Sequence, residues 1–173
     1  MSYDKNSIEA KIGECGEKIV DMFISGDYGN VVAYKPMEGK PHQIDTMIIY
    51  GWDEKNMDQL QYDVKTKPKT FKYNDTGIDK SSWDIYKALK EKNKLPTYLF
   101  FVDWFEGCCY GGEIEDLGEP DRLAFGIVFW GLNKMDVNFD LTDSQIELLK
   151  SMWVKTKAGK YLSYYESIER YFK

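Results

Sequence analysis

The sequence predicts a single α/β domain, residues 1–173, built around a mixed β-sheet with helices on its faces. The first indication is the order of its periodic segments, which reads α-β-β-β-α-β-β-α-α. The second is the run TYLFFVDW at 97–104, which is almost entirely apolar, as expected of a central strand buried on both faces. A helical segment separates this run from the preceding strand. The sequence therefore predicts a βαβ unit with a right-handed crossover at the centre of the domain.

The N-terminal half reads as one helix followed by three strands. The helix extends from about Ser7, its N-cap, to Ser25, with apolar residues recurring on one face at 100° per residue. A short loop, GKPH, and a longer polar, turn-like segment, GWDEKNMDQ, separate the strands that follow. These strands are NVVAY (30–34), QIDTMIIY (43–50) and LQYDVKTK (60–67). Three such strands in succession predict a meander.

The C-terminal half begins with a lysine-rich loop that follows Pro68 and ends at a helix capped by Asp79 or Ser81. After the buried strand at 97–104, the segment EGCCYGGEIEDLGEP reads as a loop or a short edge hairpin. The remaining predicted elements are a single strand, LAFGIVFWGL (123–132), a helix capped by Thr142, and a terminal helix, YLSYYESIERYF (161–172).

The composition argues against several classes of site. A single histidine, His42, cannot by itself supply a zinc site or a Ser/His/Asp triad. The three cysteines lack metal-ligand spacing and are expected to be free thiols. No apolar run approaches the length needed to cross a bilayer, and the protein is expected to be cytoplasmic, without a membrane partner.

The net charge of −6 conceals an uneven distribution of charged residues. Residues 65–94 contain nine lysines and four acidic residues, whereas residues 103–147 contain eleven acidic residues and two basic ones. Phosphate binding depends on the local field rather than on the net charge. The lysine-rich stretch is therefore a candidate phosphate-binding surface. The alternative is that its lysines form an ordinary solvated face.

Candidate catalytic side chains fall on the second and third predicted strands. Gln43 and Asp45 share one side of the second strand, and Asp63 and Lys65 share one face of the third. If these strands pair as a hairpin, Asp45 and Asp63 come close together, with Lys65 alongside. Two adjacent carboxylates repel each other unless a cation lies between them, and Mg²⁺ suits such oxygen ligands.

The segments GEKIVDMFI, HQIDTMII and LQYDVKTK together resemble the PD-(D/E)XK nuclease superfamily, which has the restriction-endonuclease-like fold. The resemblance covers about two thirds of the chain and is strongest to the Holliday-junction-resolvase-like branch. It implies an αβββαβ core in which Glu17, Asp45, Asp63 and Lys65 occupy the helix Glu, strand Asp and (D/E)XK positions in order. Two departures are a glutamine at position 43 and the absence of a proline next to Asp45.

The resemblance implies a Mg²⁺-dependent DNA endonuclease, with Mn²⁺ able to substitute and a homodimer as a possible assembly. Asp45, Asp63 and Glu17 are then the expected metal ligands, Lys65 assists the attacking water, and Gln43 is a further catalytic candidate. Cutting directed by DNA structure or backbone is expected, as in junction processing, repair, recombination or a phage setting. The residues expected to contact the DNA backbone are Lys67, Lys69, Lys72, Lys80 and Lys87.

Two other functions fit the same residues. One is a catalytically silent protein on this fold that binds nucleic acid or another protein. The other is a nuclease for RNA or single strands, in which aromatic side chains stack on bases. Trp83 and Tyr86 are candidates for such stacking, but their helical spacing favours the core.

Overall fold

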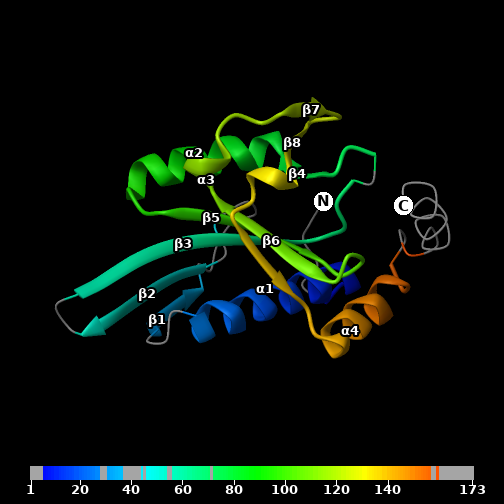
Figure 1. The fold of residues 1–173 in the computed structure, drawn as a ribbon, viewed down its shortest axis with the longest axis horizontal. Coiled ribbons are helices and arrows are strands. Elements are labelled where there is room, and N and C mark those ends of the chain that lie inside the picture. Colours follow the sequence, from blue (N-terminus) through cyan, green and yellow to red (C-terminus); the bar gives the residue numbers. More distant parts are fainter. Residues whose placement is uncertain are drawn as a thin grey trace.

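A computed structural model describes residues 6–27, 31–36, 44, 46–53, 56–70, 72–156 and 159 (Figure 1). A six-stranded mixed sheet lies at the centre, with helices on both faces, which confirms the predicted fold class. The order α1-β1-β2-β3-α2-β5 reproduces the expected αβββαβ core, with one additional strand, β4, inserted before α2.

The central sheet has the strand order β1-β2-β3-β5-β6-β9. Its strands are β1 (Val31–Pro36), β2 (Thr46–Asp53), β3 (Asn56–Thr66), β5 (Thr97–Asp103), β6 (Cys108–Glu113) and β9 (Val137–Asp140). Strands β3 and β5 are parallel and are joined through α2 (Lys80–Asn93), whereas the other neighbours are antiparallel. The predicted strand, helix, strand unit is therefore present, and it places β3 at the centre of the sheet.

Two apolar clusters fill the two faces of the sheet. Leu60, Tyr62 and Val64 of β3 pack toward α1 (Ile8–Asp27) and α4 (Asp143–Trp153), in one cluster with Phe100 and Val102. The alternate residues of β5, Leu99 and Phe101, belong to the other cluster, with Trp83 and Tyr86 of α2. Strand β5 is thus buried on both faces, as its apolar run predicts.

The helix boundaries follow the capping residues. The Ser7 side chain accepts a hydrogen bond from the Ala10 amide at the start of α1, 3.1 Å away. Asp79 occupies the N-cap position of α2 without a side-chain capping hydrogen bond, and Thr142 forms a capping box with Gln145 at the start of α4. The predicted terminal helix at 161–172 lies outside the described residues.

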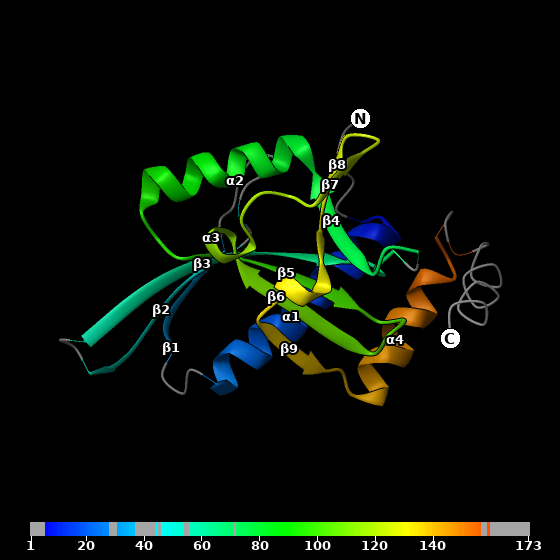
Figure 2. The same ribbon diagram turned by 45° about the horizontal axis from the view of Figure 1, so that its top comes forward.

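A second, three-stranded sheet, which the sequence analysis missed, packs beside the start of α2 (Figure 2). It has the order β4-β8-β7, with β4 (Asp75–Asp79), β8 (Ile127–Gly131) and β7 (Arg122–Ala124). The predicted single strand at 123–132 is therefore wrong. The chain reverses at Phe125 and Gly126, whose φ angles of 52° and 77° form the tight two-residue turn of a hairpin.

Three further segments differ from the prediction. The polar segment at 51–59 is largely strand, because β2 extends to Asp53 and β3 begins at Asn56. The lysine-rich loop contains β4. The predicted loop or edge hairpin after β5 is the internal strand β6 and a short helix, α3 (Ile114–Leu117), and a 3-10 turn (Leu132–Lys134) precedes β9.

The glycines of β6 explain why a loop-like sequence forms an internal strand. A Cβ at Gly111 would lie 2.5 Å from Cδ1 of Phe100 on the neighbouring strand. The large aromatic side chain of β5 therefore covers the backbone of β6, and only glycine leaves room for it. The same residue type that suggests a loop in the sequence is required here by close packing.

Candidate functional site

The structure brings Asp63 and Lys65 together near the end of β3. By the alternation along the strand, both side chains face α2, while Tyr62 and Val64 face α1. Lys65 Nζ donates a hydrogen bond to Asp63 Oδ1 at 3.0 Å and lies 2.7 Å from Oδ2. The Asp63 side chain is only 1% exposed, whereas that of Lys65 is 35% exposed. The pair thus joins a buried carboxylate to an ammonium group that reaches solvent.

One oxygen of this carboxylate is incompletely satisfied. The short approach of Lys65 Nζ to Asp63 Oδ2 is an ion-pair contact without hydrogen-bond geometry. Among the described residues, Oδ2 has no hydrogen-bond partner, although it is buried. A buried anionic oxygen in this state is expected to be completed by a donor or a cation.

Tyr86 of α2 adds a third side chain to this cluster. The residue is 0% exposed, and its hydroxyl has no hydrogen-bond partner among the described residues. Lys65 Nζ lies 5.9 Å from the centre of the Tyr86 ring. Burial raises the pKa of the Tyr86 hydroxyl, and the negative charge of Asp63 raises it further, while Lys65 opposes both effects. Tyr86 therefore keeps its proton.

The helical spacing of Tyr86 predicts a core position, and the structure places it in the core cluster on the α2 face. Its hydroxyl gives it a second role that helical spacing cannot reveal. The available signal was chemical: a tyrosine at a buried helical position needs a partner for its hydroxyl. Asp63 and Lys65 both lie close enough to the Tyr86 hydroxyl to influence its pKa, so they are the candidates for that partner.

Two predicted site residues, Gln43 and Asp45, lie outside the described residues. The residues on either side of Asp45 are described: Ile44 and Thr46 are each 2% exposed. Thr46 lies opposite Tyr62 in the antiparallel pair of β2 and β3. Thr46, the residue after Asp45 in the sequence, is thus paired with Tyr62, the residue before Asp63.

Glu17 lies on α1, and α1 and α2 cover opposite faces of the sheet (Figure 1). Asp63 and Lys65 face α2, so Glu17 belongs to the helix on the other face. It follows Gly16, where a Cβ would lie 1.9 Å from Oγ1 of Thr66. This close approach brings Glu17 to the end of β3, next to the segment that carries Lys65. The described residues include no cluster of three or more His, Cys, Asp or Glu side chains that could hold a metal.

Replacing Gly16 with alanine is expected to push α1 away from the end of β3 and to lower the melting temperature. The new methyl group must displace Thr66, and overpacking of this kind costs about 1–3 kcal/mol. Gly13→Ala is the matched control in the same helix, because its Cβ meets nothing within 4 Å. We expect it to stabilise the protein by up to about 1 kcal/mol through helix propensity. Equal melting temperatures for the two variants would contradict the close packing.

The five lysines predicted to bind phosphate lie between the end of β3 and the middle of α2, and each has a partner within the protein. Lys67 donates to the Gly77 carbonyl, and its burial, helped by the nearby charge of Lys65, lowers its pKa to about 8. Lys80 pairs with Asp84 at 2.6 Å. The others contact Asn74 and Glu106 (Lys69), the Tyr73 ring (Lys72) and the Trp83 ring (Lys87).

Asp103, at the end of β5, fixes the segment that carries Lys69. Its Oδ2 accepts a hydrogen bond from the Lys69 amide at 2.9 Å, and its Oδ1 accepts from the amides of Phe105 and Glu106. Burial raises the pKa of this carboxyl, and these amide donors partly offset the rise. Asp103 thus joins the loop after β3 to the turn after β5 and is a structural residue of the region.

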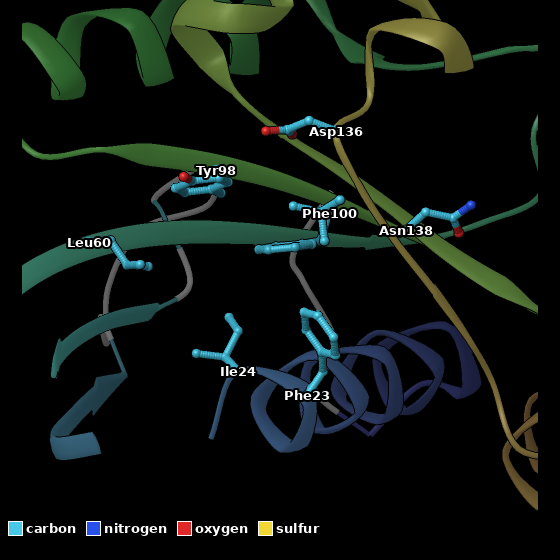
Figure 3. A pocket seen from close by; sticks show the side chains of 8 residues that line it. Phe23, Ile24, Leu60, Tyr98, Phe100, Asp136 and Asn138 are labelled. Carbon is cyan, nitrogen blue, oxygen red and sulfur yellow. The ribbon is translucent and has the colours of Figure 1, made fainter. Parts of the chain in front are cut away.

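A pocket of about 270 Å³ lies on the other side of the sheet, between α1, β3, β5 and β9 (Figure 3). Its apolar wall includes Phe23, Ile24 and Phe100, and Asp136 and Asn138 lie at its polar side. The pocket does not include Asp63, Lys65 or Tyr86. The candidate catalytic residues and the pocket are therefore separate features of the fold.

A distant structural likeness to a known protein is found, without a match at the level of sequence. No family model and no curated protein matches the sequence. A similar solved structure is that of Hjc, a Holliday junction resolvase from the archaeal hyperthermophile Archaeoglobus fulgidus. The match has a TM-score of 0.46 and 9% sequence identity, and it covers 75% of this chain and 94% of that one.

No helix in the described part of the chain is both long enough and apolar enough to cross a membrane.

Proposed function

We propose that this protein is a Mg²⁺-dependent DNA endonuclease of the PD-(D/E)XK type. The observation that carries the proposal is the Asp63–Lys65 pair on β3, with a buried carboxylate oxygen that has no hydrogen-bond partner among the described residues. The pair sits on the strand that the αβββαβ core assigns to the (D/E)XK motif, between an antiparallel and a parallel neighbour. This combination of an acid, a lysine and the strand topology favours a site for phosphodiester hydrolysis over a polar strand face without a catalytic role.

The residues present fit a hard cation in chemical type. Carboxylate oxygens are the ligands that Mg²⁺ prefers, and Asp63 supplies one that is buried and incompletely satisfied. In this proposal Asp63 and Asp45 would hold the ion. Glu17, on the other face of the sheet, would reach it around the end of β3, where Gly16 meets Thr66. Thr46 opposite Tyr62 supports placing Asp45 near Asp63. A bound Mg²⁺ supplies a Lewis acid that lowers the pKa of a coordinated water and neutralises phosphate charge.

The chain's own residues would then have separate roles. Lys65 Nζ, which reaches solvent, would donate to the attacking water or to a phosphate oxygen and stabilise the negative charge that develops there. Asp63 is held in a dry environment by the sheet and α2, where such interactions are stronger than in water. Gln43 would be a further polar residue on the strand that carries Asp45.

Lysines of α2 and of the segment before it would contact the DNA backbone. Lys72 and Lys80 are exposed, and Lys87 is partly exposed, so their ammonium groups can reach phosphates. The Lys80–Asp84 pair is a surface ion pair between adjacent turns of a helix, and breaking such a pair costs only about 0.3–0.5 kcal/mol. These contacts would position DNA without reading its sequence.

The proposal is tested by a panel of duplex DNA, single-stranded DNA, four-way junctions and RNA, each incubated with Mg²⁺ and with EDTA. We expect cleavage of at least one DNA substrate in Mg²⁺ or Mn²⁺, none in EDTA, and none by Lys65→Ala. RNA or single strands as the preferred substrates would instead support the alternative in which aromatic residues stack on bases. Equal cleavage by Lys65→Ala and the unmodified protein would refute the proposed mechanism.

A catalytically silent binding protein is the second candidate, and the ion pair itself favours it. Lys65 already neutralises Asp63, so the described part of the site needs no metal to balance its charge. Calorimetric titration with Mg²⁺ separates the two candidates. Binding that disappears in Asp63→Asn supports the endonuclease, whereas DNA binding without metal binding or cleavage supports the silent protein.

A further inference from the structure

We propose that Tyr86 is a positioning residue of the candidate site, whose hydroxyl donates a hydrogen bond to the Asp63 carboxylate when Lys65 turns toward the substrate. This inference rests on the proposed endonuclease function. It gives a residue of α2, outside the acid and lysine motif, a role in keeping the metal-binding carboxylate in place. It also explains how one lysine can serve both Asp63 and the reacting phosphate.

The first support is a pair of complementary buried atoms. The Tyr86 hydroxyl can donate one hydrogen bond, and an ionised carboxylate oxygen can only accept. The Tyr86 hydroxyl is buried and makes no hydrogen bond of good geometry with a described residue, although it lies close enough to Asp63 and Lys65 for both to influence its pKa. Asp63 Oδ2 is also buried, and its contact is the ion pair with Lys65 Nζ, 2.7 Å away. Leaving such a group unsatisfied costs about 1–3 kcal/mol, and native structures contain few of them. The hydroxyl is a donor without a well-placed acceptor, and Oδ2 loses its contact when Lys65 leaves, so the two groups are expected to bond when Lys65 turns away.

The second support is the packing that holds the Tyr86 ring. Tyr86 belongs to the same buried cluster as Trp83, Leu99 and Phe101, between α2 and the sheet. Trp83 in turn contacts Trp130 of the second sheet edge to face, with ring centres 4.8 Å apart. A ring held in this way loses little further conformational freedom when its hydroxyl forms a bond. Tyr86 is thus suited to hold a neighbouring group rather than to move.

The third support is the difference in exposure between Lys65 and Asp63. The Lys65 side chain is 35% exposed and has a flexible stem, so its ammonium group can leave Asp63 for a phosphate or a water. Asp63, at 1% exposure, cannot follow it. Without another donor, the carboxylate would lose its hydrogen bond at the moment when Lys65 acts. The Tyr86 hydroxyl, next to both groups, supplies that donor.

The test compares Tyr86→Phe with Tyr62→Phe. Tyr62 directly precedes Asp63 and is also 0% exposed, but its hydroxyl donates to Asp21 on the α1 face. The two variants therefore remove the same atom from opposite faces of the sheet. For Tyr86→Phe we expect Mg²⁺ affinity by calorimetry or kcat for the cleaved DNA to fall about 10- to 100-fold, as for other partners of metal ligands, with KM for DNA unchanged.

The melting temperatures provide a readout that is independent of activity. Tyr86→Phe removes an unsatisfied hydroxyl and is expected to leave the melting temperature unchanged or slightly higher. Tyr62→Phe removes a formed hydrogen bond, which typically contributes about 1 kcal/mol, and should lower the melting temperature while preserving kcat and Mg²⁺ affinity.

Three results would overturn the inference, and they are distinguishable. If the unmodified protein cuts DNA and Tyr86→Phe retains both its kcat and its Mg²⁺ affinity, Tyr86 has no positioning role and the proposed function stands. If Tyr86→Phe loses activity only in proportion to a lower melting temperature, its role is structural. If the unmodified protein neither binds Mg²⁺ nor cuts any substrate of the panel, the proposed function fails, and the inference fails with it.

Discussion

Asp63→Asn is expected to abolish Mg²⁺-dependent cleavage, by about 100-fold or more, while leaving the protein folded. The amide keeps the size of the carboxylate but removes its charge, so the proposed metal site loses its buried anionic ligand. The cost to stability is small, because Lys65 is 35% exposed and can extend into solvent once its partner is neutral. Cleavage rate and melting temperature, measured on the same preparation, check both parts of this expectation.

Lys65→Met is the informative companion to this variant. It also should abolish cleavage, but it leaves the buried Asp63 without its cation, so the protein should lose stability as well. Removing one partner of a fully buried pair costs about 3–5 kcal/mol, and the exposure of Lys65 places this case below that range. Asp63→Asn with wild-type cleavage would contradict the site. Loss of cleavage by Asp63→Asn at an unchanged melting temperature would show that Asp63 acts in the reaction and not only in folding.

The parts of the fold that the sequence predicts are those in which the local pattern and the tertiary role agree. The run at 97–104 is apolar at nearly every position because β5 is buried on both faces. The α1 helix shows its period and its Ser7 cap, and α4 shows its Thr142 capping box. For the candidate site, strand alternation correctly places Asp63 and Lys65 together on one face, 2.7 Å apart at their nearest polar atoms.

The parts that the sequence does not predict depend on contacts between distant segments. Strand β4 pairs with β8, about fifty residues away, so nothing in its own sequence DTGID indicates a strand. The turn of the β7–β8 hairpin places Phe125 at a positive φ, which bulky residues rarely adopt, and the apolar residues around it read as one strand. Strand β6 looks like a loop because its glycines serve close packing.

The candidate site shows the same division. A pattern of residue types finds the acid and the lysine, but the environment of Tyr86 arises from α2 crossing over β3 and is visible only in three dimensions. Lys67 was predicted to face DNA from its position after the motif. In the structure its Nζ donates to the Gly77 carbonyl, so it joins β3 to the second sheet. The second sheet is therefore linked to the strand that carries the candidate site.

Gly77→Ala is expected to be the most destabilising single-methyl change in the second sheet. A Cβ at Gly77 would lie 1.9 Å from the Val128 carbonyl oxygen and 2.9 Å from the Cα of Phe129. Both neighbours are backbone atoms of β8, so no side-chain rotation can relieve the clash, and β4 and β8 must separate. Overpacking costs about 1–3 kcal/mol, and the reduced entropy of the unfolded chain offsets about 0.4–1 kcal/mol of that cost.

A net loss of about 1–2 kcal/mol lowers the melting temperature by about 2–8 °C in a domain of this size. Gly26→Ala, whose Cβ meets nothing within 4 Å, is the control and should not lower the melting temperature. Because Gly77 also binds Lys67 and β4 leads directly into α2, the displacement should reach Tyr86 and reduce cleavage even at temperatures where the variant is folded. A destabilised Gly77→Ala that cuts at the wild-type rate would show that the second sheet supports the fold without controlling the position of α2 over β3.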